Sequence, residues 1–369
     1  MKKIFSVLLI LAVAFSAFAQ GAQEAKGESY AVAMVTDYGD ITDQSFNQTT
    51  YEACKQYCEA QGIRFAYYKP AGDSTAERVA MMEKAVDVGF NIIVMPGFAF
   101  ADAIKEAAPQ YPDVKFVALD VSEYDLTGAD MSNVYSMVYQ EEFAGFIAGY
   151  AAVKLGYTKL GYLGGMAVPA VVRFGYGFVQ GVDLAAKEAG MKLNMNYVYG
   201  NQFYGDADIT AYMDTWFGRG MECVFACGGG IFTSVAEAAA KVNGKVIGVD
   251  VDQAPIIDAN YGAGMTVTSA IKGLAASTKA TLKTIIEDGK WDTLVGKVAN
   301  LGLVSSTDLD ANFVGIPTGA GTQWSDSFTK KDCQDLVAKI LAGTIKVSSD
   351  IENAPVTTNV NVNYLGNIK

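Results

Sequence analysis

The sequence predicts an α/β protein built of two similar lobes. Short apolar strands alternate with amphipathic helices through most of the chain, which is typical of a parallel sheet covered by helices on both faces. The order strand, glycine turn, helix, strand and aspartate also occurs twice. The chain has 369 residues, more than one hydrophobic core usually supports. We therefore expect two lobes of the same architecture.

The first residues have the pattern of a secretory signal peptide. Lysines at positions 2 and 3 precede an apolar run over residues 4–18, and Ala-Phe-Ala at 17–19 offers a small-residue cleavage site. The run is too short to span a membrane. Residues 1–19 are predicted to be removed on export, and the small, polar residues 20–28 to form a disordered leader. No cysteine follows the apolar run, so we expect a periplasmic or extracellular protein without a lipid anchor.

The charge balance argues against nucleic acid and anionic membranes as partners. The chain carries 28 basic and 40 acidic side chains. Without the two lysines of the signal peptide, 26 basic and 40 acidic side chains give a net charge of −14. Such a surface repels phosphate backbones and anionic lipids.

Histidine is absent and cysteine is scarce. Without histidine, His-based catalytic triads, His general bases and the common zinc sites are excluded. The five cysteines are an odd number for an exported chain and include no C-x-x-C pattern. We expect the cysteines to be small buried residues. For the protein as a whole, we expect a binding protein with no catalytic residue, metal or cofactor.

The elements follow from hydrophobic periodicity. The first predicted strand is the apolar run Tyr30 to Thr36. The other predicted strands are short apolar runs: Arg64 to Tyr68, Asn91 to Met95, Lys115 to Leu119, Asn133 to Val138, Lys159 to Leu163, Leu193 to Val198, Cys223 to Ala226, Lys245 to Val249 and Met265 to Thr268. The predicted helices are amphipathic: Ser74 to Val88, Ala101 to Ala108, Glu141 to Lys154, Val171 to Glu188, Asp208 to Arg219, Phe232 to Lys241 and Lys272 to Asp288.

The lobe boundaries follow from this order. The helix ending at Lys154 is expected to end the first lobe, and the segment Met265 to Lys272 to cross back to it. A third crossing is expected near Asp308 to Pro317. The first lobe would then comprise residues 29–154 and about 269–310, and the second residues 155–268 and about 311–369.

The internal repeat puts an aspartate at the same place in each lobe. The segment 91–120 parallels the segment 223–250. Ligands of open α/β sheets bind at the carboxyl ends of the strands. Asp120 and Asp250 are therefore expected at equivalent edges, and facing lobes would point both carboxylates into one cleft.

The turn after the first strand has the residue types of a binding site. Asp37 follows the strand, where a carboxylate would meet a ligand. Ser45 with Gln48 fits a capping box that would fix the directions of Phe46 and Asn47. A carboxylate, an aromatic face and an amide would then converge on one region, which suits a flat, polar ring.

A set of ordered motifs links the chain to a known family. The specific ones are Thr36-Asp37 with Asp43-Gln-Ser-Phe-Asn-Gln48, and Thr268-Ser269-Ala-Ile-Lys272. Weaker motifs lie between them in the expected order: Pro96-Gly97, Asp120, Gly164-Gly165, Gly228-Gly229 and Gly248-Val249-Asp250 through Asp252-Gln253. Nearly the whole chain after the signal peptide thereby resembles the basic membrane protein family, the purine-nucleoside-binding proteins of ABC importers.

The resemblance, with the two-lobed geometry, implies the type I periplasmic binding fold, two Rossmann-like lobes joined by a multi-strand hinge whose closure traps a small ligand. It also implies a membrane ABC permease as partner, with the binding protein acting as a monomer. In the family a purine lies between aromatic rings. Carried over by motif, Phe46 resembles one ring, Asn47 and Asp37 resemble base-edge partners, and Asp120 would reach the ligand from the same lobe.

Asp250 and Lys272 resemble the ribose contacts of the family, an acceptor and a donor. A lysine at the start of a predicted helix opposes the helix dipole, which itself suggests a role for Lys272. Gly97 and Gly229, in the glycine turns of the repeat, complete the expected site, and the run at Gly229 is expected to leave room for the ligand.

The second stacking ring stays open at this point. Phe232, which follows the second glycine turn, is the first choice, and Phe174, Phe203 and Trp216 are alternatives.

Other functions also stay open. The same fold could bind a sugar, riboflavin or a signalling molecule, because stacking rings and paired aspartates also suit a sugar. Asp37, Asp40 and Asp43 could instead hold a calcium ion that activates water for nucleoside hydrolysis. Their three-residue spacing does not match an EF-hand loop.

Overall fold

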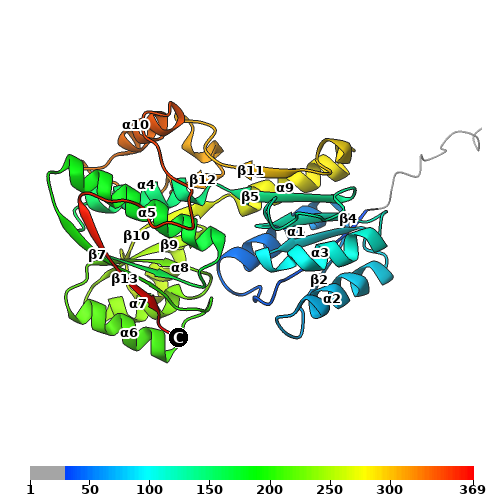
Figure 1. Ribbon diagram of the computed structural model, residues 1–369, viewed down its shortest axis with the longest axis horizontal. Coiled ribbons are helices and arrows are strands. Elements are labelled where there is room, and N and C mark those ends of the chain that lie inside the picture. The colour runs from blue at the N-terminus through cyan, green and yellow to red at the C-terminus, as the bar shows by residue number, and fades with distance from the viewer. Residues whose placement is uncertain (1–29) are drawn as a thin grey trace, which may run out of the picture. The chain divides into compact units, whose positions relative to one another are not determined.

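Two mostly parallel β-sheets, each flanked by helices, form the framework of the protein (Figure 1). The structure is a computed structural model that describes residues 30–369. The predicted signal peptide and leader lie outside the described residues. Among residues 30–369, no helix has the length and apolar composition needed to cross a membrane. The predicted α/β class is confirmed.

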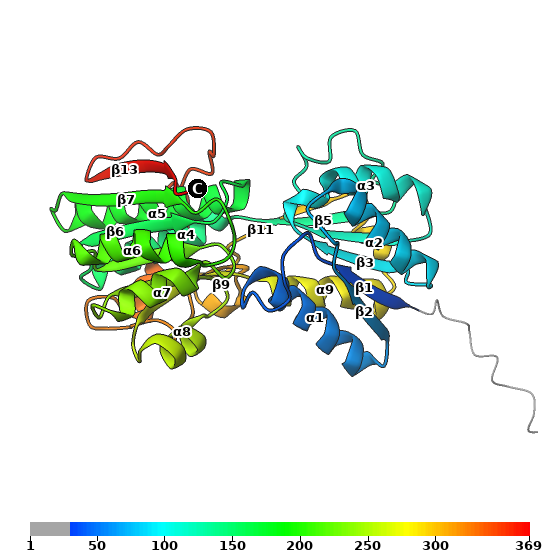
Figure 2. The same cartoon turned by 90° about the horizontal axis from the view of Figure 1, so that it is seen from below.

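The first sheet has six parallel strands in the order β11-β5-β4-β3-β1-β2. Its strands are β1 (Ala31–Val35), β2 (Arg64–Tyr68), β3 (Ile92–Pro96), β4 (Lys115–Leu119), β5 (Val134–Tyr139) and β11 (Val298–Leu301). Its helices pack in two pairs (Figure 2): α1 (Phe46–Gln61) with α9 (Leu274–Ile286), and α2 (Thr75–Asp87) with α3 (Ala101–Ala107). Short 3₁₀ helices occur at Phe98–Phe100, Ala108–Gln110 and Trp291–Thr293.

The second sheet has seven strands in the order β12-β10-β9-β8-β6-β7-β13. Its strands are β6 (Lys159–Gly164), β7 (Leu193–Tyr199), β8 (Cys223–Cys227), β9 (Lys245–Asp250), β10 (Thr266–Lys272), β12 (Val314–Gly315) and β13 (Val360–Asn367). Only β12 is antiparallel to its neighbour. The helices of this lobe are α4 (Glu141–Lys154), α5 (Pro169–Glu188), α6 (Ala207–Gly218), α7 (Phe232–Ala240), α8 (Ala254–Tyr261) and α10 (Lys330–Leu341), and a 3₁₀ helix lies at Leu309–Ala311.

The core lies on both faces of each sheet, which explains the continuous apolar runs of the strands. All residues of β1 are buried. Ala31, Ala33 and Val35 pack in one cluster with residues of α2 and α3, and alternation turns Val32 and Met34 to the opposite face. The five cysteines all lie in the described residues, and each is buried and free, as the sequence predicts.

Glycines let helices α4 and α5 approach each other closely. A Cβ at Gly145 would lie 2.0 Å from the Phe174 carbonyl oxygen, and one at Gly181 would lie 2.0 Å from the Phe146 carbonyl oxygen. Helix α4 also contacts β10, β12 and α10, so it belongs to the second lobe. The expectation that this helix ends the first lobe is therefore wrong, because its buried surface faces the second sheet.

The chain passes between the lobes after β5, after β10 and between β11 and β12. Lys272 is the last residue of β10, where Ile271 pairs with Asp250 of β9. The expected helix start at Lys272 is wrong, because Lys272 pairs with Val314 of β12 and α9 begins only at Leu274. Lys272 is therefore a strand residue and not the first residue of a helix.

Candidate functional site

A cavity of about 710 Å³ lies where the carboxyl ends of strands from both sheets meet. In the first lobe its wall includes residues that follow β1, β3 and β4, and in the second lobe residues at the ends of β8, β9 and β10. All nine residues expected to bind a ligand line it: Asp37, Phe46, Asn47, Gly97, Asp120, Gly229, Phe232, Asp250 and Lys272. The structure thus brings both copies of the repeat to one cavity.

Asp43 caps helix α1. Its carboxylate accepts hydrogen bonds from the backbone N–H groups of Ser45, Asn47 and Gln48 at 2.9, 2.9 and 3.0 Å. The expected capping box is wrong, because the Ser45 side chain makes no cap hydrogen bond. Its hydroxyl instead donates to Asp250 Oδ2 at 2.5 Å. Since Ser45 precedes α1 and Asp250 ends β9, this bond joins the two lobes at the cavity.

Asp37 is buried two residues beyond β1. Its Oδ1 accepts hydrogen bonds from the backbone N–H groups of Tyr38 and Gly39 at 2.6 and 2.7 Å. Burial raises the pKa of Asp37, although these two bonds oppose the shift. A Cβ at Gly97, where φ is 127°, would lie 2.6 Å from Asp37 Oδ2. Any larger residue at position 97 would collide with the Asp37 carboxylate, so glycine is required for Asp37 to keep its position in the cavity wall.

Two buried acceptor atoms of the cavity wall have no hydrogen-bond partner within the described part of the chain. They are Asn47 Oδ1 and Asp120 Oδ1. The Asn47 amide is held by the bond from its Nδ2 to Asp43 Oδ2 at 3.2 Å. Buried acceptors are normally paired. These atoms therefore suit a ligand that brings N–H or O–H donors.

Asp120 and Asp250 share an unusual backbone conformation. φ is 65° at Asp120 and 66° at Asp250, in the left-handed region that few non-glycine residues adopt. Burial raises the pKa of both carboxyls, for Asp250 to about 6, against the attraction of Lys272. The two copies of the repeat therefore match in backbone geometry as well as in sequence.

Lys272 lies at the centre of a buried group of charges. Its Nζ is 2.5 Å from Asp120 Oδ2 and 2.9 Å from Glu141 Oε1. Glu141 also accepts from Arg173 Nε at 2.6 Å. Burial alone would raise the pKa of Glu141, but the charges of Lys272 and Arg173 outweigh it and hold that pKa below its usual value. Lys272 Nζ also lies 5.0 Å from the ring centroid of Phe46, within the range of a cation–π contact.

Several aromatic rings line the cavity, and they differ in exposure. Phe46 and Phe203 are half-buried, whereas Phe232 and Phe174 are only 1% and 2% exposed. Trp216 is wrong as a candidate ring, because it packs in the hydrophobic core of the second lobe. The ring of Phe203 lies 6.5 Å from that of Tyr38, at an interplanar angle of 31°.

The cavity-wall side chains that sequence reasoning missed include Tyr38 and Met166. The hydroxyl of Tyr38 donates to Met166 Sδ at 3.3 Å and so joins the first lobe to the loop after β6. Tyr38 follows Asp37 directly, a position that could have marked it. Met166 directly follows Gly164-Gly165, one of the ordered motifs, a position that could have marked it as well.

The carboxylates considered for a calcium site do not act together. Asp40 is exposed and its Oδ2 accepts from Lys69 Nζ at 2.8 Å, while Asp43 caps α1. Within residues 30–369, no group of three or more His, Cys, Asp or Glu side chains is arranged to hold a metal ion. The described residues therefore offer no metal site for the alternative function, a calcium-dependent nucleoside hydrolase.

The family described as "ABC transporter substrate-binding protein PnrA-like" matches residues 30–350. The chain belongs to this family. Basic membrane protein A of Borreliella burgdorferi is 27% identical over 360 residues, which cover 96% of this chain and 97% of that protein. The resemblance to the basic membrane proteins is thereby confirmed.

A further relative is the "ABC transporter nucleoside-binding protein BmpA" of Lactococcus lactis. It is 28% identical over 234 residues, which cover 60% of this chain and 64% of the relative, just under two thirds of its length.

Solved structures of similar fold include an ABC transporter solute-binding protein from Aeropyrum pernix. Its TM-score is 0.68 at 20% identity, over 87% of this chain and 94% of that one. A solute-binding protein from Conexibacter woesei has a TM-score of 0.65 at 18% identity, over 87% of this chain and 99% of that one. The type I periplasmic binding fold is thereby confirmed. The family comprises extracytoplasmic solute-binding proteins, which implies a small-molecule ligand and a membrane permease.

Proposed function

We propose that this protein captures a purine nucleoside, such as adenosine, guanosine or inosine, and delivers it to the permease of an ABC importer. The role consists of binding and release by movement of the two lobes, outside the cytoplasm and without chemistry. One observation carries the proposal. Aromatic rings, carboxylates and unpaired acceptor atoms from both lobes line a single cavity of about 710 Å³.

The base would lie between Phe46 of the first lobe and Phe203 of the second. Both rings are half-buried and line the cavity, so each can offer a face to a ligand. The carboxylate of Asp37 and the free Oδ1 of Asn47 would accept hydrogen bonds from the ring N–H or amino groups of a purine. Stacking supplies affinity without reading the base, and these edge contacts supply the discrimination.

The ribose would lie near Asp120, Asp250 and Lys272. Asp120 Oδ1 is free to accept from a hydroxyl group, and Asp250 lines the same cavity. Lys272 Nζ could donate to a ribose oxygen while it keeps its carboxylate partners. The printed name of the Lactococcus lactis relative, a nucleoside-binding protein, agrees with this choice of ligand.

Replacing Phe46 with alanine should weaken binding of every purine nucleoside. Loss of one stacking face costs about 1 to 3 kcal/mol, or about 5- to 150-fold in Kd. The measurement is calorimetric titration of Phe46→Ala with adenosine, guanosine and inosine. Tyr124→Ala is the matched control, because Tyr124 is 88% exposed and does not line the cavity. Unchanged affinity of Phe46→Ala for all three nucleosides would remove the stacking assignment.

A nucleoside monophosphate should bind at least about 100-fold more weakly than the nucleoside. Asp37, Asp43, Asp120 and Asp250 line the cavity, whereas Lys272 is already paired with two carboxylates. A phosphate group would meet like charges, which costs several kcal/mol at close range. The test compares adenosine 5′-monophosphate with 5′-O-methyladenosine, which adds bulk at the same atom without charge. Equal weakening by both would point to size rather than charge.

The experiment that tests the function identifies the ligand directly. Mass spectrometry of the small molecule released on denaturation would be followed by calorimetric titration of the refolded, emptied protein with adenosine, guanosine, inosine, cytidine and ribose. Submicromolar binding of purine nucleosides that remain chemically unaltered is the expected result. Binding of ribose alone, or conversion of inosine to hypoxanthine, would overturn the proposal.

A further inference from the structure

The loop between β7 and α6 forms part of the cavity wall in the second lobe. Residues 201–205 all line the cavity, and Phe203 is among them. One side of the loop is held by backbone contacts, since Gly230 N donates to the Phe203 carbonyl oxygen at 2.9 Å. On the other side of the loop, the backbone N–H of Asp206 donates to Ser234 Oγ at 2.9 Å.

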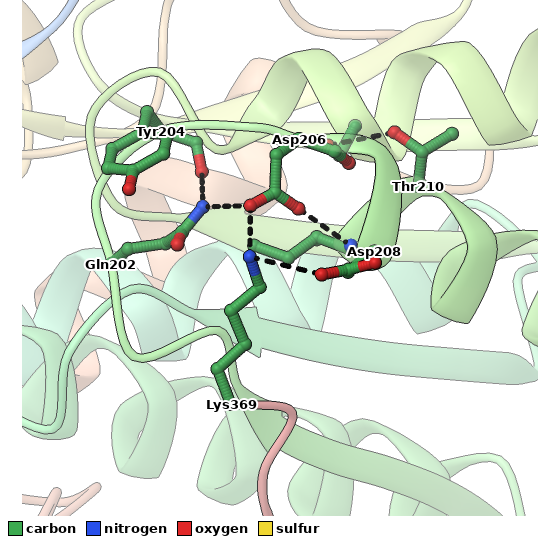
Figure 3. A network of polar contacts seen from close by, with 8 residues as sticks. Gln202, Tyr204, Asp206, Asp208, Thr210 and Lys369 are labelled. Carbon is green, nitrogen blue, oxygen red and sulfur yellow. Dashed lines mark hydrogen bonds and ion pairs between the residues drawn. The ribbon is translucent and has the colours of Figure 1, made fainter.

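Asp206 holds that other side (Figure 3). Its Oδ1 accepts from Ile209 N at 3.0 Å and so caps helix α6. Its Oδ2 accepts from Gln202 Nε2 at 2.8 Å, and the same Nε2 donates to the Tyr204 carbonyl oxygen at 2.9 Å. The carboxylate thus links the start of the helix directly to Gln202 and, through the Gln202 amide, to Tyr204.

Lys369 is the cation that faces this carboxylate. Its Nζ forms an ion pair with Asp206 and lies 3.4 Å from Asp208 Oδ2 (Figure 3). The side chain of Lys369 is 34% exposed and that of Asp206 is 26% exposed, so the pair is partly shielded from water. The pKa of Asp206 is lowered to about 2, first by the hydrogen bond from Ile209 N and then by the one from Lys369. The carboxylate therefore stays charged throughout the physiological range.

Strand β13 brings Lys369 to this place. The strand, red in Figure 1, pairs in parallel with β7, the strand that leads into the loop. Beyond it, Ile368 N donates to the Tyr199 carbonyl oxygen at 2.8 Å. The family match ends at residue 350, so β13 and Lys369 lie outside the matched region. Neither β13 nor Lys369 lines the cavity, so any effect they have on the site acts through the loop.

We propose that Lys369 is a positioning residue of the binding site. It holds Asp206, fixes the loop that presents Phe203, and thereby slows release of the ligand. Lys369 does not itself line the cavity. The effect on ligand release rests on the proposed nucleoside function, whereas the effect on the loop does not.

The first experiment measures the loop in the ligand-free protein. Hydrogen–deuterium exchange with mass spectrometry would compare wild type, Lys369→Met and Lys369→Arg over residues 200–209. Faster exchange of this segment in Lys369→Met, with wild-type rates in Lys369→Arg, is the expected result. Lys331→Met is the charge-matched control, because Lys331 forms an exposed ion pair with Asp335 on α10. Unchanged exchange in Lys369→Met would overturn the proposal, whatever ligand the protein binds.

The second experiment measures release of adenosine by stopped flow. The dissociation rate should rise about threefold in Lys369→Met, in line with a partly exposed ion pair. Lys369→Arg and Lys331→Met should keep the wild-type rate. Faster exchange of the loop with an unchanged dissociation rate would overturn the positioning role. If wild type binds no nucleoside, the proposed function fails and the exchange experiment alone decides the anchoring of the loop.

Discussion

Replacing Asp250 with asparagine is expected to stabilise the ligand-free protein while weakening its affinity for nucleosides. Burial raises the pKa of Asp250 to about 6, above a value near 4 in an unfolded chain. Between these values the native state binds more protons than the unfolded state. The contribution of Asp250 to stability therefore falls as pH rises through the window from about 4 to about 6.

Because the pKa of Asp250 is raised on folding, removing its charge should increase the free energy of unfolding. Above pH 7 the charge on Asp250 costs the fold about 2 to 3 kcal/mol, at about 1.4 kcal/mol for each pH unit between the two pKa values. Asparagine is neutral, has the same shape and tolerates the left-handed φ of 66° at this position. Urea unfolding of Asp250→Asn at pH 7.5 should therefore show a gain of that size. At pH 4.5 the wild-type carboxyl is already protonated in the native state. The gain at this pH should therefore be only about a third of the gain at pH 7.5.

The affinity change has the opposite direction. A hydrogen bond to a charged acceptor is worth about 1.5 to 3 kcal/mol, so the Kd for adenosine should rise about 10- to 100-fold in Asp250→Asn. Adenine lacks the ribose and should lose far less. Asp252→Asn is the matched control, because Asp252 is exposed and does not line the cavity. Equal weakening of adenosine and adenine by Asp250→Asn would remove the ribose assignment.

The framework could be predicted because its signals are local. A buried parallel strand such as β1 is an unbroken apolar run, and the aspartates of the repeat follow strands directly. In a parallel sheet, strand order along the chain then puts Asp37, Asp120 and Asp250 at carboxyl ends, where the cavity lies. The positions of these three carboxylates therefore follow without knowledge of contacts between distant segments.

Other features depend on contacts between distant segments. The pattern of Ser45 and Gln48 fits a capping box, but the Ser45 hydroxyl bonds to Asp250, 205 residues away. The periodicity after Lys272 predicts a helix start there, but Lys272 ends β10, where it pairs with Val314 of β12. Strand β13 alternates Val360, Val362 and Tyr364 with asparagines, and its pairing with β7 gives it a place in the second sheet.

One missed feature did have a readable signal. Gly145 and Gly149 recur four residues apart on α4, and Gly177 and Gly181 do so on α5. This spacing puts small residues on one helix face, and in the structure the two helices meet there. It could have assigned α4 to the second lobe.

Replacing Lys272 with methionine is expected to cost the fold about 3 to 5 kcal/mol, because removal of one partner leaves buried charges uncompensated. Lys272 is 3% exposed, and it pairs with Asp120 and Glu141 at 2.5 and 2.9 Å. The measurement is urea unfolding of Lys272→Met at pH 7.5. Lys283→Met is the matched control, since Lys283 forms an exposed ion pair with Asp288 at 2.6 Å and its loss should leave the midpoint unchanged.

The pH dependence of Lys272→Met distinguishes lost charge compensation from lost packing. Without the lysine, the native pKa values of Asp120 and Glu141 should both rise, because burial is then less opposed. The native state would bind more protons, so the stability deficit should shrink as pH falls from about 7 to about 4.5. The double variant Asp120→Asn/Lys272→Met should recover part of the loss at pH 7.5 for the same reason. A deficit that stays constant with pH, and no recovery in the double variant, would assign the loss to packing and leave Lys272 without an electrostatic role in the fold.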